Sequence, residues 1–127
     1  MDEPAIRVMM MPRDTNAHGT IFGGVILSII DQAGAIVAQS AGVGKVVTVA
    51  IREVIFKHPV YVGDIVSCYA EIVGRGRTSV TVEVQVVAQH PQSLAEVEVT
   101  TAELVFVHVD DDMRPVPLSA EPPAVAP

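Results

Sequence analysis

The segment from residue 23 to residue 40, GGVILSIIDQAGAIVAQS, is apolar on nearly every face of the helix that it predicts. A helix that is apolar all round is typically buried. Two glycines open the segment. Gly42 and Lys45 follow it as a C-terminal glycine and a cation beside the carboxyl end of the helix dipole. Near the midpoint stands one carboxylate, that of Asp31. The sequence therefore predicts a long buried helix that carries a single acid.

After this helix, the apolar period changes from that of a helix to that of a strand. In residues 78–89, for example, valines alternate with polar residues, so one face of the predicted strand is apolar. The predicted strands cover residues 46–56, 64–73, 78–89 and 96–109, and residues 5–11 predict a short first strand. In the last strand we expect one face to hold Val97, Val99, Thr101, Glu103, Val105, Val107 and Val109.

One long helix followed by a run of strands predicts an α+β fold, in which an antiparallel sheet of about five strands packs on the helix. A single helix covers only one face of such a sheet, yet several strands carry many apolar residues. We therefore expect the uncovered face or an edge to meet another subunit, which makes the protein at least a dimer. Residues 1–113 predict one domain. Residues 114–127, with five prolines from Pro115 on, predict an extended or disordered tail.

The net charge of −7 argues against nucleic acid as a partner. The acids are unevenly spread, because residues 32–95 hold five Lys or Arg residues and only four Asp or Glu residues. A slightly basic middle within an acidic protein is suited to an anionic small molecule.

The single cysteine, Cys68, excludes an internal disulfide and a cysteine-rich metal site. Its place in a predicted strand favours a small core residue over a nucleophile. The N-terminal residues begin with acids rather than with a basic region followed by an apolar one, so we expect no secretion signal and a cytoplasmic location.

A membrane span is not expected from residues 23–40, because they are marginal in length and contain Asp31, Gln32 and Gln39. The strand pattern of the remaining chain is that of a soluble sheet. The histidines show no spacing of metal ligands, and we expect no metal and no cofactor.

A polar loop, residues 14–22, ends in Gly23 and Gly24 at the start of the predicted helix. The first N–H groups of a helix have no partner within it, and the positive end of the helix dipole lies at the same place. Because glycine has no side chain, a ligand can approach these N–H groups closely. The pair therefore predicts a site for an anion or for the negatively charged oxygen of a reacting carbonyl. A flexible hinge or a close packing contact is the structural alternative.

Burial of a carboxylate is unfavourable by several kcal/mol unless the group is hydrogen-bonded, paired or protonated. Asp31 is therefore either satisfied structurally, for example by Ser28 three residues earlier, or used in chemistry. It lies about 11 Å beyond the glycine pair along the same helix, at a rise of about 1.5 Å per residue. One reacting group cannot touch both. Asp31 and the glycine N–H groups can act on the same bond only if they come from two subunits.

A predicted tight connection between two strands holds two arginines around a glycine, followed by two hydroxyl residues: Arg75, Gly76, Arg77, Thr78 and Ser79. Guanidinium and hydroxyl groups are suited to phosphate. Lys57 and His58 are further residues of the same chemical type. An ordinary solvated hairpin turn is the alternative.

Three segments together resemble the hotdog-fold acyl-CoA thioesterases, above all the small bacterial YciA-like acyl-CoA hydrolases: PRDTNAHGTIFGGVILSIIDQAGAIVA, VVTVAIREVIFKHPVYVGDIVSCYA and GRGRTSVTVEV. The resemblance runs from about residue 9 to residue 109. It implies a long helix wrapped by an antiparallel sheet, two such units paired edge to edge, and further assembly into a trimer of dimers. It also implies acyl-CoA as the substrate.

The resemblance assigns roles to single residues. Asp31 corresponds to a general base or nucleophile, Asn16 to the asparagine of the loop, and Gly23 and Gly24 to N–H donors. His18 departs from the family's loop, which often reads NANG or NHHG, and we expect it to alter substrate preference. The turn with Arg77, Thr78 and Ser79 corresponds to the place where the family commonly holds coenzyme A. With the candidates chosen by residue type, the expected substrate-binding residues are His18, Phe22, Lys57, His58, Arg75, Gly76, Arg77, Thr78 and Ser79.

The expected function is hydrolysis of acyl-CoA to a free acid and coenzyme A. The glycine N–H groups would bind the thioester oxygen, and Asp31 would either activate a water oriented by Asn16 or attack directly. Two alternatives stay open. A hydratase or dehydratase on the same fold usually combines a histidine with an acid at the helix, and no histidine lies between Gly19 and Val54. A non-catalytic acyl-CoA-binding module would normally be joined to an output domain.

Overall fold

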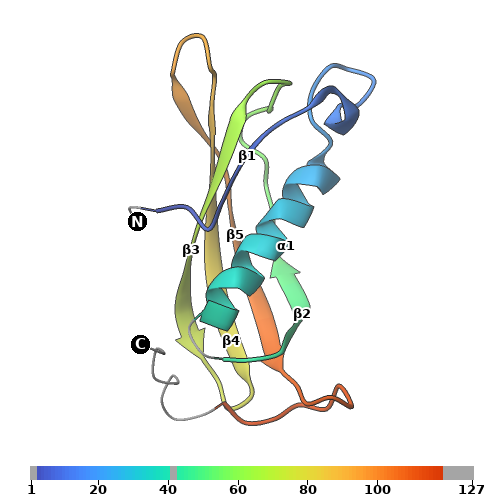
Figure 1. Ribbon diagram of the computed structural model, residues 1–127, viewed down its shortest axis with the longest axis vertical. Helices are drawn as coiled ribbons and strands as arrows, with labels where there is room; N and C mark the ends of the chain where they lie inside the picture. The colour runs from blue at the N-terminus through green and yellow to red at the C-terminus, as the bar shows by residue number, and fades with distance from the viewer. Residues whose placement is uncertain (1–2, 41–42, 119–127) are drawn as a thin grey trace, which may run out of the picture.

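The computed structural model describes residues 3–40 and 43–118. Along the chain the elements are β1 (Ile6–Met9), a 3₁₀ helix η1 (Pro12–Asp14), α1 (Gly23–Ser40), β2 (Val46–Arg52), β3 (Ile65–Arg75), β4 (Ser79–Gln89) and β5 (Glu96–His108). The strands form one antiparallel sheet in the order β1-β3-β4-β5-β2, and α1 lies across one face of it (Figure 1). The predicted α+β architecture, one helix on a five-stranded antiparallel sheet, is confirmed.

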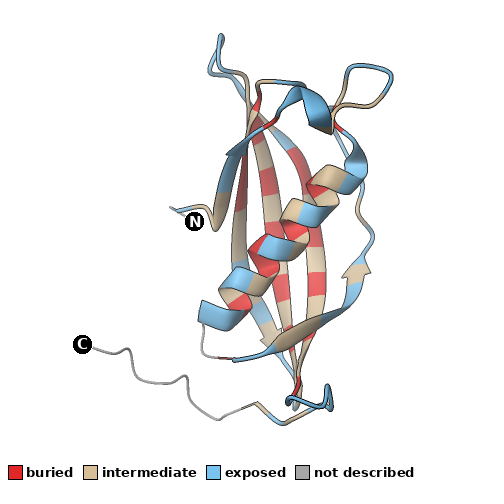
Figure 2. Cartoon of the chain, turned by 45° about the vertical axis from the view of Figure 1, so that its right-hand side comes forward, coloured by how far each residue is buried: buried red, intermediate tan, exposed pale blue. Residues whose placement is uncertain are grey.

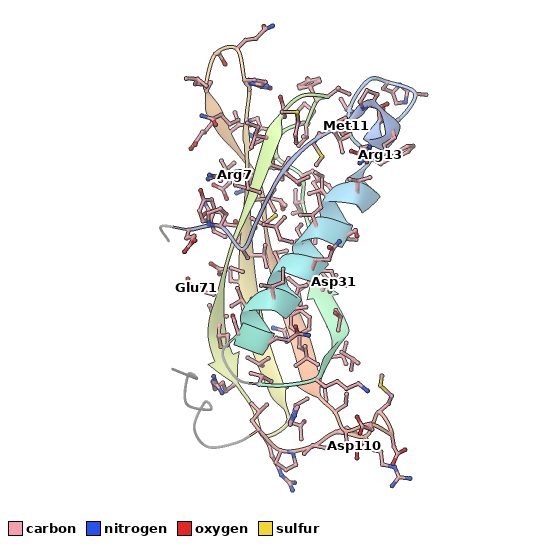
Figure 3. All side chains as sticks on the ribbon, in the orientation of Figure 1. Arg7, Met11, Arg13, Asp31, Glu71 and Asp110 are labelled. Carbon is pink, nitrogen blue, oxygen red and sulfur yellow. The ribbon has the colours of Figure 1, made fainter. Side chains whose placement is uncertain are left out.

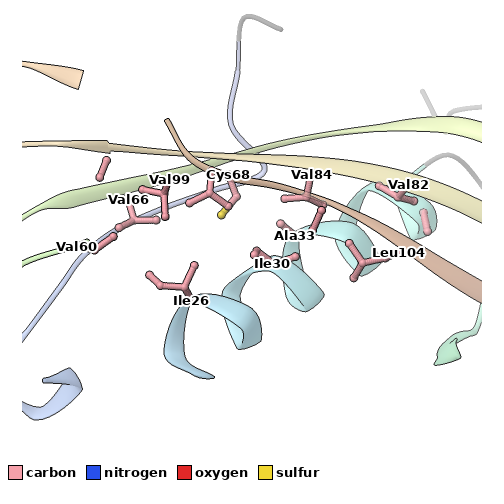
Figure 4. Packing of buried hydrophobic residues seen from close by; sticks show 14 of the residues in the cluster. Ile26, Ile30, Ala33, Val60, Val66, Cys68, Val82, Val84, Val99 and Leu104 are labelled. Atoms are coloured by element: carbon pink, nitrogen blue, oxygen red, sulfur yellow. The ribbon is translucent and has the colours of Figure 1, made fainter. Parts of the chain in front are cut away.

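The core lies between α1 and the inner face of the sheet (Figure 2). The alternation predicted for β4 is confirmed, because its four alternate valines are 0% exposed: Val80, Val82, Val84 and Val86. Ile26, Ile30 and Ala33 of α1 face the buried side chains of β3, β4 and β5 (Figure 4). Burial of a valine or isoleucine side chain contributes about 1.5–3 kcal/mol, so this face fixes the position of the helix on the sheet.

The helix is buried on one side only, and the prediction of burial all round is wrong for a single chain. Its fully buried residues form one stripe: Ile26, Ile30, Ala33, Gly34 and Ala38. On the opposite side Ser28 and Gln32 are exposed, and Ile36 is 44% exposed. The apolar residues outside the stripe are available to a further subunit.

By length and composition alone, α1 could also cross a membrane. Its buried stripe packs on the sheet, as the core helix of a soluble protein does.

The predicted face of β5 is wrong beyond its first residues. The pairing of β4 with β5 shifts in register between Val86 and Val87, where the partners change from Thr100 to Glu98 and Val99 is the extra residue. Such a bulge moves every later side chain to the other face. The residues beyond the bulge that face the core are therefore Thr100, Ala102, Leu104 and Phe106, whereas Val105 and Val107 are half-buried on the outer face with Thr101 and Glu103.

β2 is shorter than predicted, whereas the ends of β1, β3 and β4 differ from prediction by at most two residues. β2 ends at Arg52 rather than at residue 56, and Glu53 follows it with a positive φ of 29°. At the other end of the chain, the Val116 N–H donates to His108 O at 2.8 Å and the Leu118 N–H to Arg77 O at 2.9 Å. The start of the predicted tail is thus an extended segment tied to the end of the sheet, and residues 119–127 lie outside the described part.

Cys68 lies in the middle of β3 and is 0% exposed. Burial raises the pKa of its thiol to about 12. The prediction of a core residue rather than a nucleophile is confirmed, since a thiol at neutral pH is not a thiolate.

Each edge of the sheet exposes a strand. β1 is at one edge, and β2 is at the other, where Val49 is 56% exposed beside a register shift against β5. An unpaired edge strand presents backbone N–H and C=O groups to which another chain can add a strand. The predicted edge-to-edge dimer therefore has two edges available.

Candidate active site

The polar loop before the helix is closed by its own backbone. The Phe22 N–H donates to Asp14 O at 3.0 Å, and the Asn16 N–H donates to Thr20 O at 2.8 Å. Thr15 and Ile21 form a bridge between these two contacts. The loop is thus a short hairpin whose end delivers the chain directly to the first turn of α1.

The side chain of Asn16 holds this hairpin. Its Oδ1 accepts the N–H groups of His18 at 2.8 Å and Thr20 at 3.2 Å, and its Nδ2 donates to Thr20 Oγ1 at 2.8 Å. An asparagine that accepts from backbone N–H groups ahead of it is a common way to stabilise a turn. Asn16 therefore positions the loop, a role that the sequence did not reveal, and one Nδ2 hydrogen is left for another acceptor. His18 is exposed on the same loop.

Two backbone N–H groups at the start of α1 have no hydrogen-bond acceptor among the described residues. The N–H groups of Val25 and Ile26 donate to Phe22 O at 3.0 and 3.4 Å, whereas those of Gly23 and Gly24 have no acceptor among the described residues. A Cβ at Gly24 would meet nothing within 4 Å, and one at Gly23 would lie 3.2 Å from the ring of Phe56. Both N–H groups are therefore available to an acceptor from outside the described chain, and their role as donors to a reacting oxygen stays a prediction.

A pocket of about 300 Å³ opens beside Gly23. Its lining is Thr20, Ile21, Gly23, Ile26, Phe56, Lys57, His58, Pro59 and Val60. Phe22, which we expected at the substrate, is not part of this lining and is 52% exposed next to it in the chain. The pocket combines apolar walls with the ammonium group of Lys57 and the imidazole of His58. Such a lining is suited to a small-molecule ligand that is mostly apolar and carries a polar group.

Lys57 and His58 are held in the pocket by β5. His58 Nδ1 lies 2.9 Å from Glu98 O, and because a carbonyl only accepts, Nδ1 carries the hydrogen. Lys57 Nζ lies 3.3 Å from Glu98 Oε1, which also accepts from Thr101 Oγ1 at 2.9 Å. These hydrogen bonds from Thr101 and Lys57 hold the pKa of Glu98 below its ordinary value. Glu98 thus keeps its charge and holds Lys57, which lines the pocket, against β5.

Asp31 lies on the flank of α1 next to β2, and it is half-buried rather than sealed (Figure 3). Thr48 Oγ1 of β2 donates to its Oδ1 at 2.6 Å. Ser28 is not its partner, since Ser28 Oγ accepts from Gln32 Nε2 at 3.2 Å. The carboxylate therefore stands beside the open edge of the sheet, with one oxygen oriented by a hydroxyl.

The turn of residues 75–79 lies at the end of the sheet away from the pocket beside Gly23. Its Gly76 N–H donates to Ser79 O at 2.8 Å, and a Cβ at Gly76 would lie 2.5 Å from Ser79 Oγ, so a side chain at Gly76 would displace the Ser79 hydroxyl. Arg75 and Arg77 are exposed. β3 runs its full length between this turn and the pocket, about 35 Å at 3.3 Å per residue.

The structure does not bring all the predicted site residues together in one chain. Lys57 and His58 lie beside Gly23, away from the arginine turn with which their chemistry had grouped them. Asp31 is two helical turns from the glycines. In the described part of the chain, no group of three His, Cys, Asp or Glu residues is placed to hold a metal ion.

Comparisons with known proteins agree with one another. Residues 18–95 match the family model of the thioesterase superfamily. The chain is 42% identical over 123 residues to the acyl-CoA thioester hydrolase YciA of Salmonella typhimurium, covering 94% of this chain and 92% of that protein.

Solved structures of thioesterases are also similar to this chain, both in sequence and in fold. A hexameric hotdog fold thioesterase of Campylobacter jejuni superimposes with a TM-score of 0.87 at 46% identity, covering 92% of this chain and 90% of the other. HI0827, a hexameric broad specificity acyl-coenzyme A thioesterase, gives a TM-score of 0.88 at 39% identity, covering 95% and 84%. The predicted hotdog fold is confirmed.

Proposed function

The chain belongs to the thioesterase superfamily, and from that premise we propose that it hydrolyses acyl-CoA to a free acid and coenzyme A. The observation that carries the proposal is the pair of N–H groups at Gly23 and Gly24, which have no acceptor among the described residues. Gly23 lines a pocket, and a Cβ at Gly24 would meet no atom within 4 Å. A thioester oxygen bound there becomes more negative in the transition state, and one such donor lowers the barrier by about 3–4 kcal/mol. The reaction consumes water and needs no cofactor or metal.

The complete site is proposed to form between two copies. Asp31 is about 11 Å along the helix from its own glycines, but it stands beside the exposed β2 edge. Pairing of two β2 edges into one continuous sheet brings a second α1 alongside the first, so the second copy's glycine pair can meet this Asp31. The hexameric relatives support further assembly into three such dimers.

Asp31 is proposed to supply the base or the nucleophile. Thr48 occupies Oδ1, and Oδ2 accepts no hydrogen bond from the described residues, so one oxygen is free either to take a proton from water or to attack the thioester carbon. In the first case, the remaining Nδ2 hydrogen of Asn16 orients that water. In the second, the acyl group passes to Asp31 as a mixed anhydride, which water then cleaves.

The remaining candidates are proposed to bind the substrate. The pocket beside Gly23, with Lys57 and His58, takes the part of the substrate next to the thioester, and the acyl chain lies between helix and sheet. The nucleotide is bound by the 75–79 turn of a further copy, because the 75–79 turn of the same chain lies too far from the pocket beside Gly23. The residues of this turn are Arg75, Gly76, Arg77, Thr78 and Ser79. Acyl-CoA and further copies of the chain are the proposed partners, and the cytoplasm is the proposed location.

Thiol release from a panel of acyl-CoAs of different chain lengths tests the proposal. The protein's own thiol does not interfere, because Cys68 is fully buried. We expect Asp31→Asn to keep the fold and the oligomer and to lower kcat several hundred-fold, since the amide can neither accept a proton nor attack. Gln39→Ala, at an exposed position of the same helix, is the matched control and should behave as wild type. Near-normal turnover by Asp31→Asn would reject the role of the carboxylate.

One observation favours a second candidate. His58 lines the pocket beside Gly23 with its Nε2 free of the bond to Glu98, so a histidine does stand near the start of the helix, as hydratase chemistry requires. Consumption of an enoyl-CoA without thiol release would replace the hydrolase by a hydratase. If the protein binds acyl-CoA but neither hydrolyses it nor hydrates an enoyl-CoA, it is a non-catalytic acyl-CoA-binding module.

A further inference from the structure

One five-residue turn holds both ends of the loop that carries Asn16. This turn, residues 60–64, precedes β3 and lies at the same end of the molecule as the loop (Figure 1). Before the loop, the Met10 N–H donates to Asp64 O at 2.9 Å, and Met10 O accepts from the Gly63 N–H at 2.8 Å. After the loop, the Ile21 N–H donates to Val60 O at 2.8 Å, and Thr20 forms a bridge with Tyr61. The position of the loop therefore depends on the shape of the 60–64 turn.

The 60–64 turn is held in shape by a buried carboxylate. The side chain of Asp64 is only 2% exposed. Its Oδ2 accepts the N–H of Tyr61 at 3.0 Å, across the turn, and its Oδ1 lies 2.5 Å from Nδ1 of His90. A carboxylate buried this deeply needs such partners, because an unpaired buried charge is strongly destabilising.

His90 reaches the turn from a different part of the sheet. It stands directly after β4, at the start of the connection to β5, and its side chain is 38% exposed. Its ring centroid is 6.0 Å from that of Tyr61. The surrounding hollow is lined by residues 61–64 and 90–93, so Asp64 and Tyr61 are the titratable side chains that face His90 there. Neither Asp64 nor His90 lines the pocket beside Gly23.

We propose that Asp64 and His90 are positioning residues for the active site. His90 fixes Asp64, Asp64 fixes the 60–64 turn, and the turn sets the two ends of the loop that places Asn16 and delivers the chain to Gly23. The inference rests on the proposed function of that loop. Because a displacement of about 1 Å in a catalytic group can lower a rate a hundred-fold, loss of this pair slows turnover without removing any group that touches the substrate.

Three variants test the pair. His90→Ala removes the donor to Asp64, His90→Gln keeps an N–H that can reach it, and Gln92→Ala is the control on the same connection. Each is assayed for kcat and KM with one acyl-CoA, and for amide hydrogen exchange by mass spectrometry. We expect His90→Ala to lower kcat about tenfold with KM changed less than twofold. Exchange should become faster in residues 10–22, while β4 stays protected. His90→Gln should recover most of the loss, and Gln92→Ala should match wild type.

Two results would overturn the inference. If His90→Ala keeps wild-type exchange in residues 10–22 and wild-type kcat, the pair does not position the loop. If exchange rises equally in β4 and the loss of kcat merely follows the folded fraction, the pair contributes to stability alone. A wild-type protein that releases no thiol from any acyl-CoA would defeat the proposed function instead, and the exchange of residues 10–22 in His90→Ala would still test the positioning.

Discussion

At the scale of single residues, the two glycines at the start of α1 differ in their surroundings. A methyl group at Gly23 would press on Phe56, whereas one at Gly24 would meet no atom of the described chain. The absence of a side chain at Gly24 is therefore not required by packing within this chain. It leaves room for something outside the chain.

Gly24→Ala tests that room directly. Alanine is the better helix residue by up to about 1 kcal/mol, and Gly24 does not have a positive φ, so we expect no loss of stability. We expect kcat to fall at least about tenfold, because the new methyl group occupies the approach to the N–H donors. Thiol release and thermal unfolding measure the two effects. Full activity in this variant would show that neither a substrate nor a second copy comes close to Gly24.

The sequence singles out candidate residues by their type. The glycine pair and Asp31 stand out because they lie at the start and in the middle of an apolar helix, whereas Asn16 is a candidate only through the family resemblance. Their partners do not stand out. Thr48 contacts Asp31 from 17 positions away, and Glu98 contacts Lys57 from 41 positions away, and both are ordinary residues of strands. Only the pairing of the strands brings such residues together.

At the scale of elements, the helix lies very close to the sheet at Gly34. A Cβ at this position would lie 3.0 Å from two ring carbons of Phe106 and 3.6 Å from Leu104. Both side chains are buried and cannot move into solvent. Glycine in the middle of a helix weakens it, so here the close contact with β5 outweighs helix propensity.

Gly34→Ala should therefore destabilise the protein although it improves helix propensity. Overpacking of a core is unfavourable by about 1–3 kcal/mol, and after a gain in helix propensity of about 1 kcal/mol we expect the free energy of unfolding to fall by up to about 2 kcal/mol. Urea unfolding at one protein concentration measures it. Gly24→Ala on the same helix provides the comparison, and equal stabilisation by both changes would contradict the tight contact.

The elements were predictable to different degrees. The helix bounds follow from the glycines on either side of the apolar segment, and the inner face of β4 follows from its strict alternation; both are confirmed. The face of β5 was wrong because a bulge at Val99 depends on pairing with β4, and the pattern of β5 carries no sign of it. β2 is shorter than predicted because the chain turns at Glu53, where an apolar run continues in sequence but not in the sheet.

At the scale of the whole molecule, the proposed site is spread over three places. The glycine pair is at one end of the sheet, Asp31 is beside the β2 edge, and the turn with Arg77 is at the other end. The sequence predicted the need for two subunits from the length of a helix. The sequence did not show that the arginine turn is also separated, because its distance from the glycines depends on the course of β3.

Arg77→Ala should separate binding of the nucleotide from the chemistry. Loss of a charge-assisted hydrogen bond to phosphate is expected to raise KM for acyl-CoA about tenfold, with kcat little changed. KM for a short thioester without the nucleotide should stay within about twofold. Arg114→Ala removes the same charge from an exposed position and should leave both values unchanged. Equal effects of Arg77→Ala on both substrates would remove the nucleotide from this turn.

The separation of about 11 Å between Asp31 and the glycine pair of the same chain predicts that variant subunits can complement one another. If each centre takes its acid from one copy and its amides from another, two variants of low activity can complement one another. A mixture of Asp31→Asn and Gly24→Ala chains, unfolded together and reassembled, would regain about one quarter of the wild-type centres, because half of the random pairs each rebuild one intact centre of two. Separately reassembled chains mixed afterwards would stay at low activity until their subunits exchange.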